Sequence, residues 1–418
     1  MPADPGPRVT GALRHRDFAL LWAGQTVSLA GNGVFTVALP LEVLRLTGSS
    51  LELALIISAR TLPAVLLLLV GGTLVDRMSR RLVMLVSDSV CAACVGAVAL
   101  LIAAGKAGLW ELAALSAVFG VASAFFKPAS TAITGDILPA RLLMSASSLS
   151  SLSASLAQYL VGPLAGGIIV AATGPAWAFG LDAISFTVSA GCLAAMRPAK
   201  RPGGPSQPVL AGIKEGLRYC RSQPWLWWSM IAVGIANLAC YVPLAIFQPL
   251  LVKHVFHAGP AALGIMYAAT GAGGMLASIY AARRPTPRHR VAAIWAGWAG
   301  AGLAAVALGL APWLWLAVLL SGLAWSGITY GNVLWFPLMQ TEVPPRLLGR
   351  ASSVDWMLSL ALAPAGTIAG GAVAAVAGVR FALILGGSVA AATGAVLLVP
   401  RVTEPDRKRQ DRSAAAHY

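Results

Sequence analysis

The feature that most limits the fold of this chain is a series of apolar segments, each long enough to cross a lipid bilayer as a helix. A membrane-spanning helix needs about 20 mostly apolar residues. Six segments of this kind precede a polar stretch near the middle of the chain, and six follow it. They cover residues 18–44, 51–74, 82–104, 109–127, 147–170, 175–196, 225–252, 259–282, 290–310, 312–336, 351–376 and 378–400. The sequence therefore predicts an all-α membrane protein with twelve transmembrane helices.

Charged residues are too scarce to cover a water-facing surface. They make up 11% of the 418 residues, against roughly 25% in soluble domains. The excess of 30 Lys and Arg over 15 Asp and Glu would indicate a nucleic-acid partner if the bases formed one patch, but they lie in short gaps between apolar segments. We therefore expect membrane lipids around the protein and no nucleic acid.

The distribution of the basic residues predicts which loops face the cytoplasm. With the N-terminus inside, the outer segments hold only Arg45, Lys106, Lys253 and Arg380, and Arg60 lies within a span. All other bases fall in inner segments, which is the positive-inside bias. The first residues lack the pattern of a cleaved signal peptide. We expect a multi-pass protein of the cell inner (plasma) membrane with cytoplasmic N- and C-termini.

An internal repeat predicts two halves of the same orientation. Leu138-Pro-Ala-Arg-Leu-Leu before the fifth span matches Val343-Pro-Pro-Arg-Leu-Leu before the eleventh, about half the chain length later. Because each half holds an even number of spans, the repeat is parallel. The expected organisation is a cytoplasmic N-terminus (1–17), an N-terminal six-helix half (18–196), a cytoplasmic linker (197–224), a C-terminal six-helix half (225–400) and a cytoplasmic tail (401–418).

The loop between the second and third spans carries a charge motif, Gly72-Thr-Leu-Val-Asp76-Arg77-Met-Ser-Arg80-Arg81. Its aspartate can accept bonds from a helix N-terminus or a basic partner, so the cluster could hold the cytoplasmic side closed. The motif closely resembles the loop signature Gly-x-Leu-x-Asp-Arg-x-Gly-Arg-Arg of the major facilitator superfamily, with Ser79 replacing a glycine. The resemblance implies that superfamily's fold, two pseudo-symmetric six-helix halves. It also implies a gating loop formed by Gly72, Asp76, Arg77, Arg80 and Arg81.

The fifth span contains a run of small residues and a proline, Gly162-Pro163-Leu-Ala-Gly166-Gly167. Small residues four apart let helices approach closely, and proline interrupts the backbone hydrogen-bond ladder. The run resembles the core of the fifth-helix motif of exporters, although Gln158 stands where that family has another glycine. The resemblance implies a preference for outward transport; helix packing without directional meaning is the alternative.

The opening helix narrows the resemblance to one group. Arg16-Asp-Phe-Ala-Leu-Leu-Trp22-Ala-Gly24-Gln25 and Ser28-Leu-Ala-Gly31-Asn32 resemble the first helix of enterobactin exporters and macrolide-efflux proteins. The segment from Val343 to Arg350 resembles the same group, so the similarity covers nearly the whole chain. Many relatives carry an acid at the position of Asn32, and its replacement removes one candidate proton carrier.

Ionisable residues within the spans are candidates for coupling, because a charge in the bilayer is energetically costly. Arg60 in the second span is the deepest charge and needs an acidic or carbonyl partner; its role is structural pairing, coupling or substrate contact. Asp182 in the sixth span is the deepest acid and a candidate proton carrier. Asp88 is a candidate for coupling or a partner of the basic loop. Glu42 lies near the outer end of the first span, as a gate residue or an interfacial one.

Amides and aromatic residues in the cavity-lining helices of this fold are the candidate substrate contacts, with helix–helix hydrogen bonding as the alternative for each amide. They are Gln25, Asn32, Asn237, Tyr241, Gln248, Asn332 and Trp335. Such a lining suits lipophilic or amphipathic solutes better than sugars or phosphates. Most of the 13 tryptophans are expected at the membrane interfaces or against lipid.

These features predict a secondary active transporter, coupled to protons or another cation, that exports a drug, antibiotic or secondary metabolite by alternating access. An uptake symporter of the same fold and a siderophore exporter are the alternatives. A membrane enzyme is disfavoured, because all five histidines lie in loops, helix ends or the tail and no nucleophile, metal or ATP-binding motif occurs. We expect no cofactor or metal, a small-molecule substrate, and a monomer.

Overall fold

The computed structural model describes residues 11–75, 79–197, 209–285 and 287–397, and these residues form helices joined by short turns, with no strand among them. The predicted all-α class is therefore confirmed. Eleven helical segments of this part of the chain are long and apolar enough to cross a membrane, and a twelfth, Val379–Ala395, is apolar but shorter. Each predicted span coincides with one of these twelve segments.

The first six spans are built from seven α-helices and one π-helical segment. Their bounds are α1 (Arg16–Thr47), α2 (Ser50–Val75), α3 (Arg80–Ala103), α4 (Leu109–Ile137), α5 (Ala140–Ser153), the π-helix η2 (Ala154–Val161), α6 (Gly162–Thr173) and α7 (Pro175–Ala195). A short 3-10 helix, η1 (Gly11–Arg14), precedes α1. The fifth span is thus one continuous run of α5, η2 and α6.

The later spans follow a helix within the predicted linker, α8 (Val209–Ser222). The seventh span combines α9 (Pro224–Ala236), the π-helix η3 (Asn237–Tyr241), α10 (Leu244–Leu250) and the π-helix η4 (Leu251–Val255). The others are α11 (Pro260–Arg283), α12 (Arg290–Leu310), α13 (Leu314–Glu342), α14 (Pro345–Leu360) with α15 (Ala363–Ala377), and α16 (Val379–Leu397).

Glycines make four of the tight turns between successive spans. Gly48, Gly105, Gly174 and Gly378 have φ between 66° and 86°, the left-handed region that side chains disfavour. At the first of them, the N–H of Gly48 bonds to the carbonyl of Leu44 and ends α1. All four turns join helices at the side that the basic residues predict to be outside.

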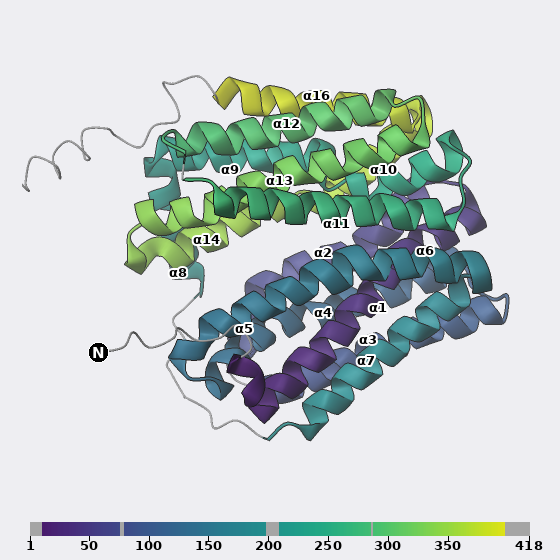
Figure 1. Ribbon diagram of the computed structural model, residues 1–418, viewed down its shortest axis with the longest axis horizontal. Coiled ribbons are helices and arrows are strands. Elements are labelled where there is room, and N and C mark those ends of the chain that lie inside the picture. Colours follow the sequence, from purple (N-terminus) through teal and green to yellow (C-terminus); the bar gives the residue numbers. More distant parts are fainter. Residues whose placement is uncertain (1–10, 76–78, 198–208, 286, 398–418) are drawn as a thin grey trace, which may run out of the picture. The chain divides into compact units, whose positions relative to one another are not determined.

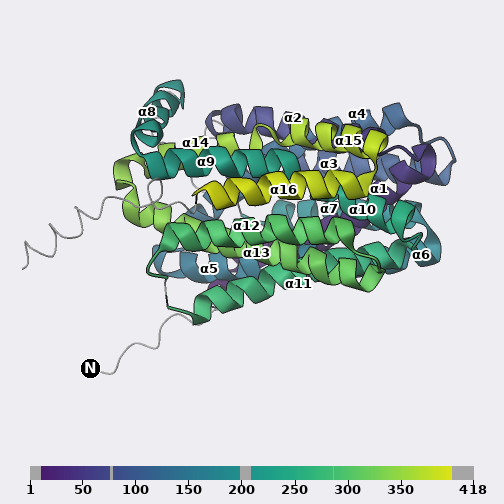
Figure 2. The same cartoon turned by 90° about the horizontal axis from the view of Figure 1, so that it is seen from above.

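The chain divides into two compact units. Unit 1 comprises Met1–Ser206, Ala245–Ala272 and Thr367–Val376, and unit 2 comprises Gln207–Leu244, Gly273–Gly366 and Ala377–Tyr418. In unit 1, α7 packs against α1 and α3, and α4 packs against α2 and α3 (Figure 1). In unit 2, α12 packs against α13 and α16, while α14 packs against α8 and α9 (Figure 2). The two halves predicted on either side of the linker stay a prediction.

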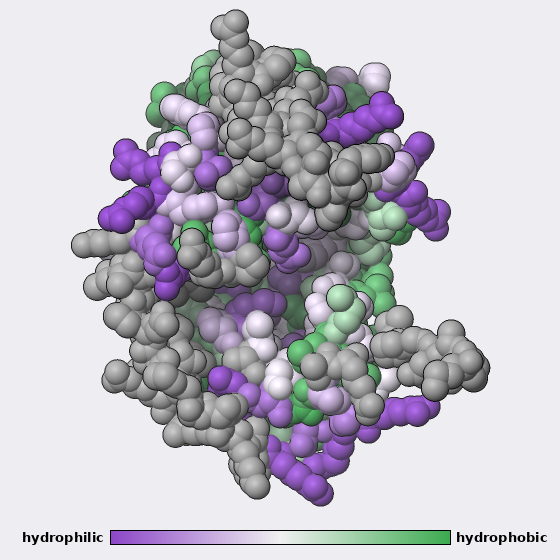
Figure 3. All heavy atoms as spheres, turned by 90° about the vertical axis from the view of Figure 1, so that its left-hand side faces the viewer, coloured by the Kyte–Doolittle hydropathy of each residue, from purple (hydrophilic) through white to green (hydrophobic). Residues whose placement is uncertain are grey.

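The surface carries large apolar side chains, as a lipid-facing protein requires. Trp110, Trp177, Trp313 and Trp315, in the first turns of α4, α7 and α13 or just before, are 66–83% exposed. Tryptophans at helix ends suit the membrane interface. Hydrophilic side chains gather at the helix ends that Figure 3 presents to the viewer.

Four other tryptophans do not fit the interface prediction. Trp225, Trp295, Trp298 and Trp335 are at most 5% exposed and belong to one apolar core cluster of unit 2. Their rings lie edge to face or tilted, with centroids 4.9–6.1 Å apart, as aromatic pairs prefer. Packing between helices, rather than the membrane interface, accounts for these residues.

Candidate functional site

Arg60, the deepest charge expected from the sequence, lies on α2 against two aromatic rings of unit 1. Its guanidinium carbon is 4.5 Å from the ring centroid of Phe35 on α1 and 4.1 Å from that of Phe119 on α4. Its Nη2 donates to Oδ1 of Asn32 at 3.4 Å. A desolvated cation over an aromatic face gains up to about 2 kcal/mol. The two rings therefore stabilise a charge that would otherwise be costly within a span.

Asp182 on α7 is the acid that faces this cation. It is fully buried, and its charge interacts with that of Arg60. The hydroxyl of Ser185 donates to Oδ1 of Asp182 at 3.2 Å and to its carbonyl at 2.7 Å. Within the described residues, Oδ2 of Asp182 has no hydrogen-bond partner. Asp182 is thus an acid close enough to interact with Arg60, whereas the role of Arg60 in pairing, coupling or substrate contact stays a prediction.

Glycines on one face of α1 allow α7 to approach this site. A Cβ on Gly31 would overlap the side chains of Ser185 and Asp182, and one on Gly24 would lie 3.0 Å from Cβ of Cys192. Residues seven apart lie on the same face of a helix. The glycines of the opening motif therefore have a direct physical role, since they let Asp182 reach the interior beside α1.

Asp88 on α3 is a second buried acid of unit 1. It is 2% exposed, is hydrogen bonded to Ser189, and lies near the thiol of Cys91. Its Oδ2 has no partner among the residues that the structure describes. Two bases of the loop motif, Arg80 and Arg81, bond to other groups, so the role of Asp88 as a partner of that loop stays a prediction.

Glu42 differs from these two acids in having a close counter-charge. It is fully buried near the outer end of α1, and its carboxylate accepts two hydrogen bonds from the guanidinium of Arg45 at 2.7 and 2.8 Å. Arg45 itself is 60% exposed, and Lys253 lies close enough to interact with both charges. The positive charge of Arg45 therefore balances the negative charge of Glu42 within the folded chain.

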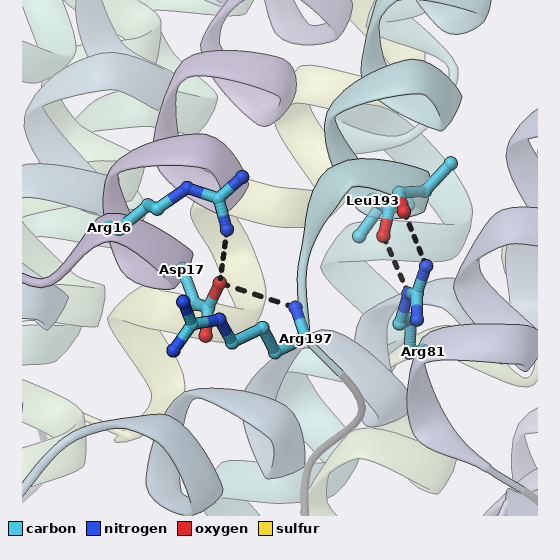
Figure 4. Close-up of polar contacts among 6 residues, drawn as sticks. Arg16, Asp17, Arg81, Leu193 and Arg197 are labelled. Carbon is cyan, nitrogen blue, oxygen red and sulfur yellow. Dashed lines mark hydrogen bonds and ion pairs between the residues drawn. The ribbon is translucent and has the colours of Figure 1, made fainter.

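The loop motif joins the ends of α2, α3, α4 and α7. Gly72 lies in the last turn of α2, whereas Asp76 and Arg77 lie outside the described residues. Nη1 of Arg80 contacts both carboxylate oxygens of Asp136 on α4 at 2.6 Å. Arg81 donates from Nε to the carbonyl of Leu193 at 2.7 Å and also to the next carbonyl of α7 (Figure 4). A cation at a helix C-terminus is favourable, so Arg81 caps α7.

Asp17 makes a second link at the same end of unit 1. Its Oδ1 accepts a hydrogen bond from the backbone N–H of Arg197 at 3.3 Å and lies 3.7 Å from Nη1 of Arg16 (Figure 4). The start of α1 and the residue that follows the sixth span are therefore joined, although they are far apart in sequence.

These observations describe a bundle of membrane-spanning helices with charged residues inside one unit. Comparison with known protein families shows the family to which the chain belongs. The model of the family described as transmembrane secretion effector matches residues 9–418. The chain belongs to this family. Its relatives are exporters of the major facilitator type, so the predicted fold, superfamily and non-enzymatic class are confirmed.

Two curated relatives of this chain have names that describe them as exporters. The multidrug efflux pump Tap of Mycolicibacterium fortuitum is 30% identical over 385 residues, which cover 87% of this chain and 89% of Tap. The enterobactin exporter EntS of Citrobacter koseri is 25% identical over 356 residues, 81% of each chain. A bacterial homologue of the iron transporter ferroportin in an inward-facing state has the same fold, with a TM-score of 0.71, 14% identity, and 92% and 98% of the two chains covered.

Small residues in the fifth span contact two other helices. A Cβ on Gly162 would lie 2.7 Å from Cα of Gly33, and one on Gly166 would lie 2.9 Å from Cα of Val34; both atoms belong to α1. One on Gly167 would lie 3.1 Å from Cα of Gly264 on α11. The packing part of the prediction is thus observed; the preference for outward transport stays a prediction.

The proline of this span follows the π-helical segment η2, which the sequence did not lead us to expect. Pro163 has no N–H to bond to the carbonyl of Tyr159, and the N–H of Gly162 bonds five residues back, to Ala157. Gly271 of α11 packs directly against that carbonyl of Tyr159. π-Helical turns often occur at functional sites of helices.

The predicted cavity residues mostly make hydrogen bonds to neighbouring helices. Gln25 donates to Ser130 at 2.6 Å, Gln248 to Thr270 at 3.2 Å, and Asn237 to the carbonyl of Ser359 at 3.0 Å. The hydroxyl of Tyr241 donates to the carbonyl of Trp298, and Trp335 donates to Asp355 at 3.1 Å. Asn32 contacts Arg60, and Asn332 is exposed. The lining of a substrate cavity by these residues stays a prediction.

Two acids were overlooked at the level of sequence. Asp136 bonds to Arg80, and Asp355 is 6% exposed beside Trp335. Asp355 falls in the first turns of the predicted span 351–376, so the rule that selected Asp182 applied to it as well. In the structure, α8 and α9 pack against its helix.

Proposed function

We propose that this secretion effector is a proton-coupled exporter of lipophilic or amphipathic small molecules that works by alternating access. The observation that carries the proposal is the interaction of Arg60, which lies over two aromatic rings, with the fully buried Asp182 inside the spans of unit 1. The similarity to a multidrug efflux pump over most of both chains supports outward transport of such solutes. The protein acts as a monomer in the plasma membrane, with both termini in the cytoplasm.

Asp182 is the proposed proton carrier. Its ionised form is favoured by Arg60 and by one hydroxyl, but its Oδ2 lacks a donor within the described residues. The ionised and protonated forms of a buried carboxyl are close in free energy when a cation offsets its desolvation. Protonation from outside releases the attraction to Arg60, and deprotonation inside restores it, which gives two states of the same helices.

The other candidate acids fit this role less well. The carboxylate of Glu42 is already held by two hydrogen bonds from Arg45, and charge-assisted pairs of this kind are among the stronger hydrogen bonds. Asp88 lacks a basic neighbour comparable to Arg60 in the described chain, so its ionised form has less support. We therefore assign Asp88 to a proton path toward Asp182, and Glu42 to an outer gate with Arg45.

The substrate contacts proposed for unit 1 lie on the face of α1 that carries Gln25, Asn32 and Phe35. Arg60 adds a half-buried guanidinium between two aromatic rings at this face. Amide, aromatic and cationic groups together suit an amphipathic solute with an aromatic part. They also suit an anionic aromatic compound, and the similarity to an enterobactin exporter favours a siderophore as the second candidate substrate class.

The cytoplasmic ends of α2, α3, α4 and α7 form the proposed gate. The Arg80–Asp136 ion pair and the capping of α7 by Arg81 tie these ends together. Asp76 and Arg77 belong to the same motif. Opening the gate would break contacts of this group, so Asp136→Asn is expected to change the rate of transport rather than the affinity for substrate.

The direct test measures gradient-driven accumulation in everted membrane vesicles. Acidifying the lumen should drive a lipophilic cationic dye into vesicles that contain the wild-type chain, and nigericin, which exchanges protons for potassium, should abolish this accumulation. Asp182→Asn should lose it while keeping downhill exchange of the dye, because exchange needs binding and alternation but no proton. Measuring accumulation of an anionic catechol compound in the same vesicles tests the second substrate class.

Glu111→Gln is the matched control, since Glu111 is an exposed acid in the first turn of α4. It should accumulate dye as the wild type does. Full accumulation by Asp182→Asn would contradict the assignment of the carrier. Accumulation of no compound under a pH gradient would contradict proton-coupled export.

A further inference from the structure

Unit 2 holds a buried acid that the proposed mechanism does not use. Asp355 on α14 is 6% exposed, and the indole N–H of Trp335 on α13 donates to its Oδ2 at 3.1 Å. Its Oδ1 is buried and has no hydrogen-bond partner among the described residues. Such orphaned atoms are uncommon in folded proteins and call for an explanation.

The surroundings of this carboxyl are aromatic and apolar. Trp225 and Trp298 lie against Trp335 with ring centroids 6.1 and 5.9 Å away. Two other buried indoles donate elsewhere, since Trp298 bonds to the carbonyl of Ile328 and Trp295 to the hydroxyl of Ser229. Trp335 is therefore the indole that positions Asp355.

Among the described side chains, the helices packed against α14 bring no cation to this carboxyl. On α8, Arg221 lies over the ring of Trp227, Arg218 is exposed, and Glu215 forms an ion pair with Arg350 of α14. On α13, Glu342 is exposed and the ring of Tyr330 contacts that of Tyr280, while α9 carries no titratable side chain. Within the described residues, Asp355 has no ion pair.

Among the described residues, a thiol is the titratable group that interacts with Asp355. Cys220 on α8 is fully buried, and burial raises the pKa of this thiol to about 11, with the neighbouring Asp355 carboxylate adding to the rise. The thiol therefore stays neutral near pH 7 and cannot supply a counter-charge.

An ionised carboxylate without a cation in such a place is costly, and uptake of a proton is the ordinary way to remove that cost. This distinguishes Asp355 from Asp182, whose charge Arg60 offsets. We propose that Asp355 is a second, independent proton-binding site, positioned by Trp335, through which unit 2 takes part in coupling. Its use in a transport cycle rests on the proposed function, whereas proton binding itself does not.

The test uses the purified full-length protein, with isotope-labelled aspartate, and infrared spectroscopy between acid and alkaline pH. A protonated carboxyl shows a C=O stretching band that ionisation removes. We expect one such band to be lost in Asp355→Asn and kept in Asp182→Asn. Trp335→Phe should shift its frequency or its midpoint, because it removes the hydrogen bond to Oδ2. Asp355→Glu, which keeps an ionisable group but carries no label, should replace the labelled band by an unlabelled one and serves if the asparagine variant does not fold.

Two outcomes would overturn the proposal. One is a spectrum of Asp355→Asn, or of the labelled Asp355→Glu protein, that matches the wild type at every pH. The other is a carboxyl at this position that is ionised across the whole pH range in which the protein is folded. Vesicle transport is measured separately, so a chain that binds this proton but accumulates no solute would refute the proposed function and leave the proton site standing.

Discussion

Replacing Gly33 by alanine tests the close contact between the first span and the exporter-type segment of the fifth. A Cβ at this position would lie 2.7 Å from the carbonyl oxygen of Gln158, 2.8 Å from Cα of Gly162 and 3.0 Å from Cδ of Pro163. All three atoms belong to the backbone or to a rigid ring, so no flexible side chain can move aside. The methyl group must instead push α1 away from η2 and α6.

The expected magnitude follows from comparison with a glycine that faces open space. At Gly180 on α7, an added methyl group would have no atom of another residue within 4 Å, so Gly180→Ala introduces no clash. Both variants gain the same advantage of alanine over glycine in a helix, up to about 1 kcal/mol. Their difference therefore isolates the overpacking, which typically costs about 1–3 kcal/mol, or about a tenfold change in the unfolding equilibrium for each 1.4 kcal/mol.

The measurement is unfolding of both purified variants in mixed micelles containing increasing amounts of a denaturing detergent, followed by helical circular dichroism. Gly33→Ala should unfold earlier than Gly180→Ala by the stated difference. Equal stabilities, within about 0.5 kcal/mol, would refute the inference that these glycines are required for helix approach. In that case the fifth-span motif would have no role in packing against the first helix.

Three further outcomes follow from individual contacts. Arg81→Gln should destabilise the chain by about 1–2 kcal/mol in the same unfolding assay, because two carbonyls of the α7 terminus lose a charged donor. Arg16→Gln is the control: it loses only a long, exposed ion pair and should change the free energy of unfolding by less than about 0.5 kcal/mol. Arg45→Gln should destabilise more than Glu42→Gln, because it leaves the buried carboxylate unpaired whereas the exposed guanidinium can turn to water; the reverse order would contradict the assigned burial. Alkylation of Cys220 by a maleimide should stay slow near pH 8 and rise only as the pH approaches 11, since burial raises the pKa of this thiol and the thiolate is the reactive form; rapid labelling of a Cys220-only variant near pH 8 would contradict it.

Much of the architecture could be predicted from local sequence. A run of about 20 apolar residues has few alternatives to a membrane helix, because every backbone polar group must be satisfied within the bilayer. The spans, the class of fold and the superfamily were therefore predicted correctly. The turn glycine Gly174, between the fifth and sixth spans, is an example of a local signal that needs no tertiary information.

Which residues meet inside the bundle could not be read in this way. Both the lipid-facing and the packed side of a membrane helix are apolar, so periodicity does not show that Phe35 and Phe119 face Arg60 or that Trp335 faces inward. The same ambiguity hides the burial of Asp355.

The sequence by itself thus indicated twelve apolar segments suited to cross a membrane and the superfamily of the chain, because length, hydropathy and short loop motifs are properties of contiguous residues. Only the tertiary structure decided that, among the described residues, Asp182 interacts with a cation whereas Asp355 has no ion pair. The physical reason is that the state of a buried carboxyl depends on neighbours from other helices, here Arg60 of α2 and Trp335 of α13.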